Sequence, residues 1–313
     1  MEIRPATLDD VVAITEVHKG DIPIWYRGFG DERIPSSYEK LTVFERYIAG
    51  GPWMSVETCA VHVNELLLHD LPPIVVVLDQ QVVAEAEFYI GEEGTPYGRT
   101  LDISVLYVHP ECQRQGVGGE LLEYLIERAE RKQCRCLTVV PGPRGFYQRY
   151  GFNSTYTRPH LLINAEISDI QYTIEELPIE TPWRVVTGLP MPIGRYTSSR
   201  QEWERHKMIT YQLPEVASCL HRRMRIQTPS AEAVLILSQH SPFDDALVAH
   251  AWTATMPISD LVAIARHESA VSGYKQLRML IDQEIVKEPL HLVTIEQSLS
   301  TCLVRWLHDP LGT

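Results

Sequence analysis

The sequence predicts an α/β fold built on a mixed β-sheet. Strand-like and helix-like segments alternate through the first half of the 313 residues, and several strand-like segments follow one another as pairs. A glycine loop also joins a strand to an amphipathic helix near Gly116. Alternation puts helices on the faces of a sheet, whereas consecutive strands pair antiparallel, so a mixed sheet is expected.

The first half of the chain gives the clearest elements. Thr7 can cap the first helix, and Gly50 and Gly51 are typical of the end of the second. A turn near Gln80 and Gln81 joins two strands. In order, we expect a strand at 2–7, helices at 8–19 and 38–50, strands at 73–80, 82–90 and 101–108, a helix at 119–132, a strand at 134–140, a short helix at 143–150 and an extended segment at 151–166.

The second half shows a fainter pattern that restarts near Asp169. We expect strands at 231–239, 245–254 and 260–266, a helix at 272–288, a strand at 290–297 and a final helix at 299–309. A shift of about 155 residues lays Thr138 on Thr294 and Arg149 on Arg305, with a helix falling on a helix. We interpret this as an internal duplication, with domains at 1–168 and 169–313.

Composition argues against several classes of function. A net charge of −13, without clustered lysine and arginine, is unlike a nucleic-acid binder. The acidic field would favour a cationic substrate, or serve only solubility. The six cysteines form no C-x-x-C pair and the histidines lack metal-ligand spacing, so we expect buried thiols and no metal. No apolar run reaches about 18 residues, and the N-terminus lacks an apolar core, so we expect a cytoplasmic protein without membrane contact.

The stretch "HPECQRQGVGGELLEYLIERAE" at 109–130 carries the strongest functional signal. Gly116, Gly118 and Gly119 stand at the entrance of a helix, where free N–H groups and the positive end of the dipole favour an anion. A Walker A loop would end in Gly-Lys-Ser/Thr, whereas this loop ends in Gly-Gly-Glu. A dinucleotide loop needs a third glycine where Leu121 stands and an acid where Val140 stands.

The remaining pattern is Q/R-x-x-G-x-G/A, which Gln113, Gly116 and Gly118 match. Together with its context, this loop resembles the GNAT superfamily of N-acetyltransferases. Three further segments resemble those of the family in the same order: "EIRPATLDDVVAI" at 2–14, "LYVHPE" at 106–111 and "FYQRYGF" at 146–152. The resemblance covers residues 1 to about 165 and implies the GNAT fold there, with two tandem GNAT-like domains if the duplication holds.

The resemblance implies acetyl-CoA as cosubstrate. In the family, the loop binds the pyrophosphate through backbone N–H groups, and the strand before it pairs with the pantetheine arm. Carried over to this sequence, the strand contributes Leu106, Tyr107 and Val108, and the loop contributes Gln113, Arg114, Gln115, Gly116, Val117, Gly118 and Gly119.

The resemblance also implies catalytic residues. Tyr147 falls on the family's general-acid tyrosine, which protonates the leaving thiolate. Asp102 falls where many members carry an acid that acts as a base, while Glu87 or Glu85 on the neighbouring strand could reach the same site. The backbone N–H of Val108 would meet the oxyanion.

The second half lacks this machinery. When the two halves are aligned with the shift of about 155 residues, Leu303 takes the place of Tyr147, and Gly273 is the only loop glycine retained. We therefore expect a degenerate GNAT-like domain that shapes the acceptor site, forms a homodimer or supports the first domain. The main hypothesis is an N-acetyltransferase acting on a small or peptidic amine. The alternatives are a non-enzymatic CoA-binding regulatory module, and transfer of a longer acyl group or transfer to oxygen.

Overall fold

The structure is a computed structural model that describes residues 1–143, 145–194, 198–210, 213–217, 219–239, 244–281 and 292–308. The chain forms two compact units, each discontinuous in sequence. Unit 1 comprises Met1–Tyr89, Ile103–Lys132 and Met208–Ala217; unit 2 comprises Ile90–Asp102, Gln133–Lys207 and Ser218–Thr313. The predicted division at 168/169 stays a prediction.

Unit 1 is built on strands that the sequence predicted closely. Its strands follow the order β1-β4-β5-β6, and β4 pairs antiparallel with both β1 and β5. The two longest, β5 and β6, continue into unit 2. The strands are β1 (Glu2–Pro5), β4 (Ile74–Leu78), β5 (Gln81–Glu93) and β6 (Gly98–Val108), with a separate pair β2 (Trp25–Arg27) and β3 (Ile34–Ser36).

The longer helices of unit 1 begin at identifiable caps. Thr42 accepts a hydrogen bond from the Glu45 N–H at the start of α2, and Ser55 accepts one from the Thr58 N–H at the start of α3. The sequence reading missed α3 altogether. The helices are α1 (Val11–Lys19), α2 (Val43–Gly50), α3 (Val56–Leu68) and α4 (Val117–Arg131), with short 3-10 turns at Leu8–Asp10, Gly30–Glu32, Tyr38–Lys40, Pro52–Met54 and Pro110–Cys112.

Strand β5 separates two layers of helices. Side chains alternate along a strand, so Phe88 points away from Glu85 and Glu87. The guanidinium of Arg128 in α4 lies 4.8 Å from the centre of the Phe88 ring, whereas His18 in α1 and His62 in α3 contact Glu85 and Glu87. Two acidic side chains therefore point from the sheet toward α1 and α3, and α4 covers the other face.

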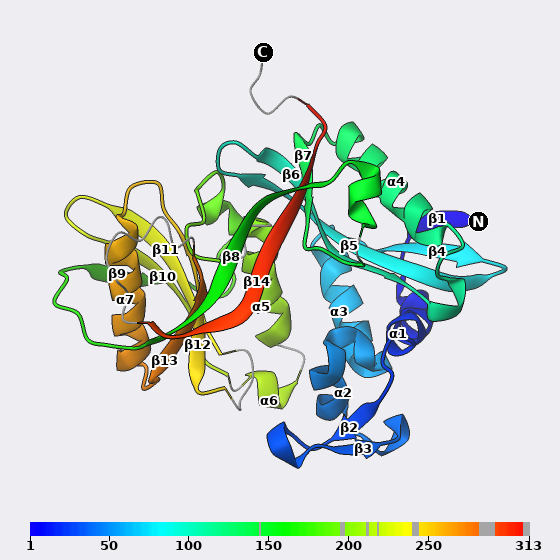
Figure 1. The fold of residues 1–313 in the computed structure, drawn as a ribbon, viewed down its shortest axis with the longest axis horizontal. Helices are drawn as coiled ribbons and strands as arrows, with labels where there is room; N and C mark the ends of the chain where they lie inside the picture. The colour runs from blue at the N-terminus through cyan, green and yellow to red at the C-terminus, as the bar shows by residue number, and fades with distance from the viewer. Residues whose placement is uncertain are drawn as a thin grey trace. The chain divides into compact units, whose positions relative to one another are not determined.

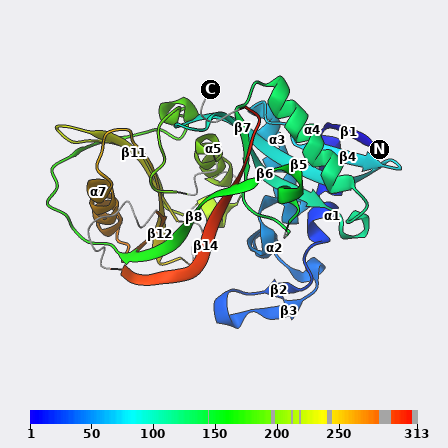
Figure 2. The same ribbon diagram turned by 45° about the horizontal axis from the view of Figure 1, so that its top comes forward.

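Unit 2 continues the sheet in the order β6-β7-β14-β8-β13-β12-β11-β10-β9. In its hydrophobic core, α7 packs against β11, β12 and β13. Figure 2 shows α7 next to β11 and β12. The strands are β7 (Cys136–Val139), β8 (Asn153–Asn164), β9 (Thr173–Glu176), β10 (His221–Gln227), β11 (Glu232–Ser238), β12 (Ala246–Trp252), β13 (Gln276–Leu280) and β14 (Leu292–Trp306). The helices are α5 (Ser199–Thr210), which ends in unit 1, and α7 (Ile258–Val271), with 3-10 turns at Tyr147–Tyr150 and Trp183–Val186; the short α6 (Pro214–Ala217) belongs to unit 1.

The structure corrects three elements expected in the second half. Residues 260–266 belong to helix α7, not to a strand. The expected helix at 272–288 contains strand β13, and residues 282–288 lie outside the described residues. In the expected final helix at 299–309, residues 299–306 form the end of β14, and residue 309 lies outside the described residues. The alignment at a shift of about 155 residues is therefore wrong, since it laid helix α4 on strand β13.

A different internal correspondence follows from the order of elements. Antiparallel strands β10, β11 and β12 precede helix α7, and β13 returns parallel to β12. The order β4, β5, β6, α4 and β7 in the first half is the same. Helix α7 begins 141 residues after α4, at Ile258 against Val117, and β13 begins 140 after β7, at Gln276 against Cys136.

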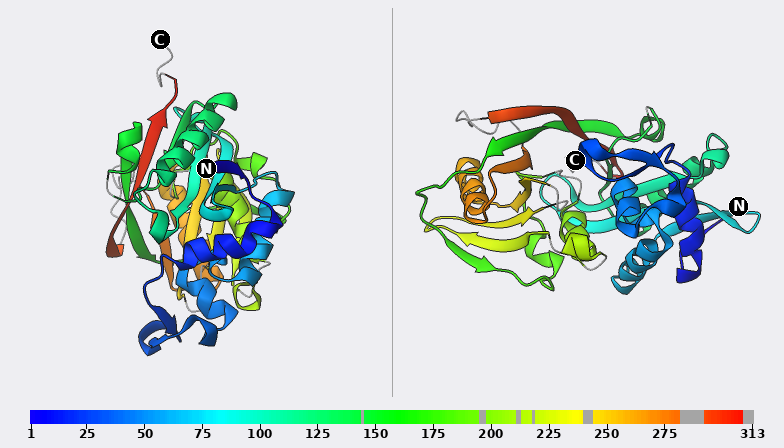
Figure 3. Two further views of the ribbon diagram at one scale, coloured as in Figure 1. Left: turned by 90° about the vertical axis from the view of Figure 1, so that its right-hand side faces the viewer. Right: turned by 90° about the horizontal axis from the view of Figure 1, so that it is seen from below.

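The last strand returns to the first half of the sequence. β14 lies between β7 and β8, pairing antiparallel with both, and the β8–β14 pair forms a long green-and-red ribbon (Figures 1 and 3). Leu303 is opposite Val139, and Val304 is opposite Thr138. β8 in turn pairs antiparallel with β13. Residues near the C-terminus thus complete the sheet that begins with β6 and β7.

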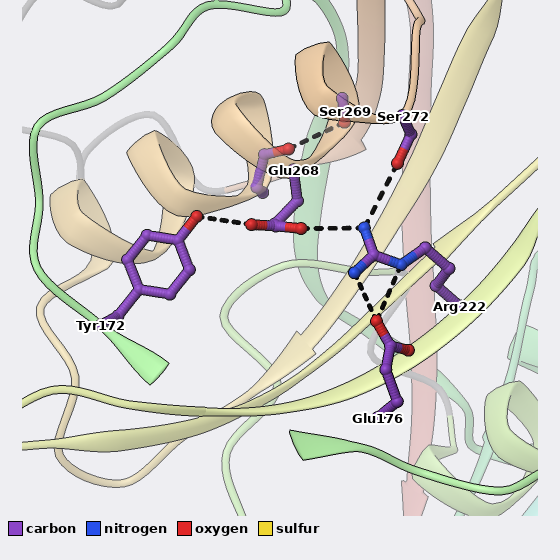
Figure 4. A network of polar contacts seen from close by, with 7 residues as sticks. Tyr172, Glu176, Arg222, Glu268, Ser269 and Ser272 are labelled. Carbon is purple, nitrogen blue, oxygen red and sulfur yellow. Dashed lines mark hydrogen bonds and ion pairs between the residues drawn. The ribbon is translucent and has the colours of Figure 1, made fainter. Parts of the chain in front are cut away.

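A polar network ties α7 to the edge strands of unit 2 (Figure 4). Glu268 on α7 is 4% exposed; it accepts hydrogen bonds from the Tyr172 hydroxyl at 2.5 Å and from Arg222 Nη1 at 2.8 Å. The same guanidinium pairs with Glu176 on β9 and donates to the Ser272 hydroxyl. Both oxygens of the buried Glu268 carboxylate therefore have a partner, and the network ties α7 to β9 and β10.

Candidate functional site

The glycine loop forms an open cradle at the start of α4. Gly116 is the N-cap residue with φ +91°, a left-handed conformation that disfavours side chains, and an added Cβ would meet no atom within 4 Å. The loop residues 113–116 are exposed. The N–H groups of Val117 and Gly118 begin a helix of 15 residues, and the positive end of this long helix lies at the open loop.

Two glutamine side chains brace the loop from within. Gln113 Nε2 donates to the carbonyl of Val108 at 3.1 Å, and Gln115 Nε2 donates to the carbonyl of Glu111 at 2.7 Å. The N–H of His109 donates to Val83 O on β5 at 2.8 Å, which anchors the end of β6. The predicted cofactor residues of β6 and the loop are thus held together in unit 1, in an arrangement that fits an anionic group such as a pyrophosphate.

The predicted acid and the first candidate base lie together in unit 2. Tyr147 is 6% exposed and packs edge-on against Phe146 and Phe152. Burial raises the pKa of Tyr147 to about 12, and the negative charge of Asp102 adds to the rise. The phenol is therefore protonated at neutral pH, as a proton donor must be.

Asp102 is a buried carboxylate with a defined donor. It is 2% exposed, and its Oδ1 accepts a hydrogen bond of 2.7 Å from the Thr138 hydroxyl on β7. A cavity of about 260 Å³ opens next to the tyrosine turn, lined by Pro141, Gly142, Pro143, Gly145, Gln148 and Leu303. A Cβ on Gly142 would stand 3.1 Å from Tyr147 Cε2, so glycine lets the loop lie against the ring.

The other candidate base, Glu87, lies in unit 1 within a buried polar cluster. Its Oε1 accepts a hydrogen bond of 2.8 Å from Trp53 Nε1 and lies 2.7 Å from His62 Nε2. Glu85, two residues earlier, places Oε2 3.1 Å from His18 Nε2. All four titratable side chains are at most 5% exposed. The predicted catalytic residues therefore fall into two sets, Asp102 with Tyr147 and Glu87 with Glu85.

Burial controls the charges of this cluster. Burial raises the pKa of Glu85 well above its usual range, and the charge of Glu87 raises it further. Burial lowers the pKa of His18 to about 3, with a smaller contribution from His62. At neutral pH the His18 imidazole is therefore uncharged.

Sequence reasoning missed the partners of the predicted residues. His18, Trp53, His62 and Thr138 received no role, although they contact Glu85, Glu87 or Asp102. The available signal was position: His18 shares the buried face of α1 with Ile14, and His62 shares that of α3 with Cys59. Among the residues that the structure describes, no group of three or more histidine, cysteine or acidic side chains could hold a metal ion.

Comparisons with known proteins point to one family. The family model described as "Acetyltransferase (GNAT) domain" matches residues 72–154, which include β5, β6, the glycine loop, α4 and Tyr147. None of the curated proteins matches the chain. In the described part of the chain, no helix is both long and apolar enough to cross a membrane.

Several solved structures share the fold over almost the whole chain. A GCN5-related N-acetyltransferase from Anabaena variabilis has a TM-score of 0.62 at 12% identity, covering 98% of this chain and 73% of that one. A GCN5-related N-acetyltransferase from Kribbella flavida has a TM-score of 0.58 at 13% identity, covering 98% of this chain and 71% of that one. A putative acetyltransferase from Pyrococcus horikoshii has a TM-score of 0.51 at 13% identity, covering 98% of this chain and 89% of that one. The chain is thus a GNAT acetyltransferase-fold protein, with the family's acetyltransferase domain recognised at residues 72–154.

Proposed function

We propose that the protein transfers an acetyl group from acetyl-CoA to the amine of a small molecule or peptide. The observation that carries the proposal is the open glycine cradle at the start of α4, directly after β6. Acetyl-CoA would supply the acetyl group as a thioester, and CoA would leave as the thiol. The backbone of Leu106–Val108 and the loop 113–119 would hold it.

The chain's own residues would move the protons. The acceptor ammonium loses a proton to become a nucleophile, and the nitrogen loses a second as the N–C bond forms and the C–S bond breaks. Asp102 is our first candidate for the base and Glu87 the second, while Tyr147 would protonate the leaving sulfur. One proton returns to the sulfur, so one is released for each turnover.

We also propose that the second half is a GNAT-like domain without a cofactor. The order β10, β11, β12, α7 and β13 supports this, because it repeats the order of elements around α4. The loop between β12 and α7 reads "TATMP" and contains no glycine, so the open cradle at Gly116 has no counterpart. One cofactor per chain is therefore expected.

Calorimetry and turnover together test the function. One acetyl-CoA should bind per chain, and Gly116→Glu should abolish binding by filling the cradle with a like charge. Gly30→Glu is the matched control, since Gly30 also has positive φ and open space around it. Acetyl-CoA consumption with an amine library then separates an enzyme from a CoA-binding module. Binding without transfer to any amine would favour the module.

A further inference from the structure

Tyr107 lies where the candidate cofactor strand meets the buried polar cluster. It stands in β6 between Leu106 and Val108 and is 37% exposed. Because side chains alternate along a strand, the Tyr107 ring points away from the side chains of its two neighbours. An aromatic ring thus remains accessible beside the backbone groups that the proposed function gives to the thioester.

The ring is held by a second layer of aromatic side chains. The His18 ring lies 4.4 Å from that of Tyr107, measured between centroids, and also stacks on Trp53 at 5.0 Å with an interplanar angle of 11°. We call these three side chains the aromatic wall. His18 is fully buried at the centre of the wall, Trp53 is partly buried, and Tyr107 is its most exposed member.

Glu85 and Glu87 on β5 contact the buried side of the aromatic wall. Glu85 contacts the Nε2 of His18, and Glu87 Oε1 accepts the hydrogen bond of Trp53 and also contacts His62 Nε2. Among the described residues, neither carboxylate forms an ion pair with lysine or arginine. Within the part of the chain that the structure describes, His18 Nδ1 and His62 Nδ1 are buried without a hydrogen-bond partner.

Such an arrangement costs stability and therefore indicates a role. Buried carboxyl groups without a compensating cation, and buried polar atoms without partners, each cost free energy that apolar side chains at the same positions would not. Clusters of this kind occur at functional sites more often than in ordinary cores. The wall and its anchors hold in place the exposed ring of Tyr107, which a ligand can reach.

The charges around Tyr107 select for a cation. Asp21 is exposed, and its N–H donates to the carbonyl of His18 at 3.2 Å. A Cβ on the preceding Gly20 would stand 3.4 Å from His109 Nε2, so Asp21 lies beside the end of β6 that carries Tyr107. Burial raises the pKa of Tyr107, and the negative charge of Asp21 adds to the rise. His18, whose ring contacts that of Tyr107, does not oppose a cation, because burial lowers its pKa to about 3 and leaves it neutral. Lys19, close in sequence, instead pairs with Glu16 and lies over the Tyr38 ring.

We propose that the Tyr107 ring and the Asp21 carboxylate receive the acceptor as an ammonium ion, with the wall holding the ring in place. A cation over an aromatic ring, next to a carboxylate, gains from the ring quadrupole and from direct Coulomb attraction. The acceptor class is then an aliphatic amine that is charged when it binds, in preference to a neutral amine. This inference rests on the proposed acetyl transfer.

Two acceptors and three variants test the assignment. Butylamine is positively charged at neutral pH and aniline is not. Tyr107→Leu removes the ring, and Asp21→Asn removes the charge; each should raise KM for butylamine by about 3- to 30-fold, the scale of a cation–π or close charge contact. Tyr107→Phe keeps the ring, and its KM for butylamine should be closer to the wild-type value than that of Tyr107→Leu. KM for acetyl-CoA, and KM for aniline, should change less than about twofold.

Matched controls separate recognition from packing. Tyr26→Leu removes a tyrosine of similar exposure, 39%, and Asp9→Asn removes another exposed acid. Both variants should keep the wild-type KM for butylamine, aniline and acetyl-CoA. Equal losses for butylamine and aniline, or no loss for either, overturn the assignment.

A separate measurement keeps this inference distinct from the proposed function. If the wild type binds acetyl-CoA but acetylates no amine of the library, butylamine and aniline included, acetyl transfer to amines is wrong. Calorimetric titration with butylamine then tests Tyr107 alone. Weaker binding to Tyr107→Leu than to wild type supports the ammonium site, and equal binding overturns it.

Discussion

The hydroxyl of Thr138 donates a hydrogen bond of 2.7 Å to Asp102 Oδ1, and both side chains are 2% exposed. A buried carboxylate depends strongly on each donor, because water cannot replace it. Thr138→Val keeps the shape and removes the donor. We expect the free energy of unfolding to fall by about 1–3 kcal/mol in urea denaturation. Thr157→Val, at an exposed threonine on β8, is the control, and an equal loss in both would contradict the special role of this bond.

Asp102 and Glu87 compete for the role of base, and paired isosteric variants decide between them. The variant at the true base should lose about 10²-fold or more in kcat, while acetyl-CoA affinity stays close to wild type. We expect this result for Asp102→Asn, since Asp102 lies near enough to Tyr147 to raise its pKa. Single-turnover kinetics and calorimetry give both quantities. If Glu87→Gln lost this much kcat while Asp102→Asn stayed active, the base would be Glu87 and not Asp102.

Tyr147→Phe tests the proton donor. The variant keeps the ring that packs against Phe146 and Phe152 but removes the proton. We expect kcat to fall by about 10²-fold or more with little change in acetyl-CoA affinity. Tyr150→Phe, three residues later on the same 3-10 turn, should have little effect. Wild-type turnover in Tyr147→Phe would leave the tyrosine a packing role only.

Glu93 should make stability depend on pH near neutrality. Its carboxylate accepts hydrogen bonds from the Ser199 N–H at 2.9 Å and the Ser199 hydroxyl at 2.6 Å, at the start of α5. Burial nevertheless raises the pKa of Glu93 from 4.5 to about 7. The folded protein thus retains a proton that the unfolded chain releases. This contribution to stability is complete below about pH 4.5 and is lost as the pH rises through about 7.

The measurement compares urea unfolding of wild type and Glu93→Gln between about pH 5 and pH 8. The wild type should lose more stability across this range than the variant, which cannot ionise. Glu92→Gln is the control, because Glu92 forms a surface pair with Arg99. Parallel curves for wild type and Glu93→Gln would show that Glu93 does not titrate in this range.

The sequence predicted the fold best where local chemistry determines it. The glycine loop, the caps and the alternating strands of the first half depend on neighbouring residues, and β4, β5, β6 and α4 were predicted nearly at their observed positions. In the second half, the short apolar run at 260–266 was read as a strand. Its extension to Ile258–Val271 buries Leu261, Val262, Ala265 and Glu268 at helical spacing, which a seven-residue window cannot show.

The buried cluster could not be predicted for a different reason. His18 and Glu85 lie 67 positions apart in sequence, and His62 and Glu87 lie 25 apart. Only the packing of α1 and α3 on β5 brings them together, so no local pattern records the contact. The second part of β14 was likewise predicted as a helix. Its partners β7 and β8, which supply the hydrogen bonds that a strand requires, are distant in sequence, so no local pattern indicates the pairing.

The position of β14 leads to a prediction about truncation. A chain that ends at residue 168 keeps β7 and β8 but loses β14, which pairs with both, and β13, the other partner of β8. It would expose the edges of β7 and β8, together with apolar side chains such as Leu161 that are now buried. We therefore expect this fragment to aggregate and to lack a cooperative thermal transition. A chain that ends at residue 308 keeps all of β14 and should unfold like wild type. If the 168-residue fragment were soluble, unfolded cooperatively and bound acetyl-CoA, β14 would be dispensable to the first half, and the predicted division at 168/169 would describe an independent folding unit.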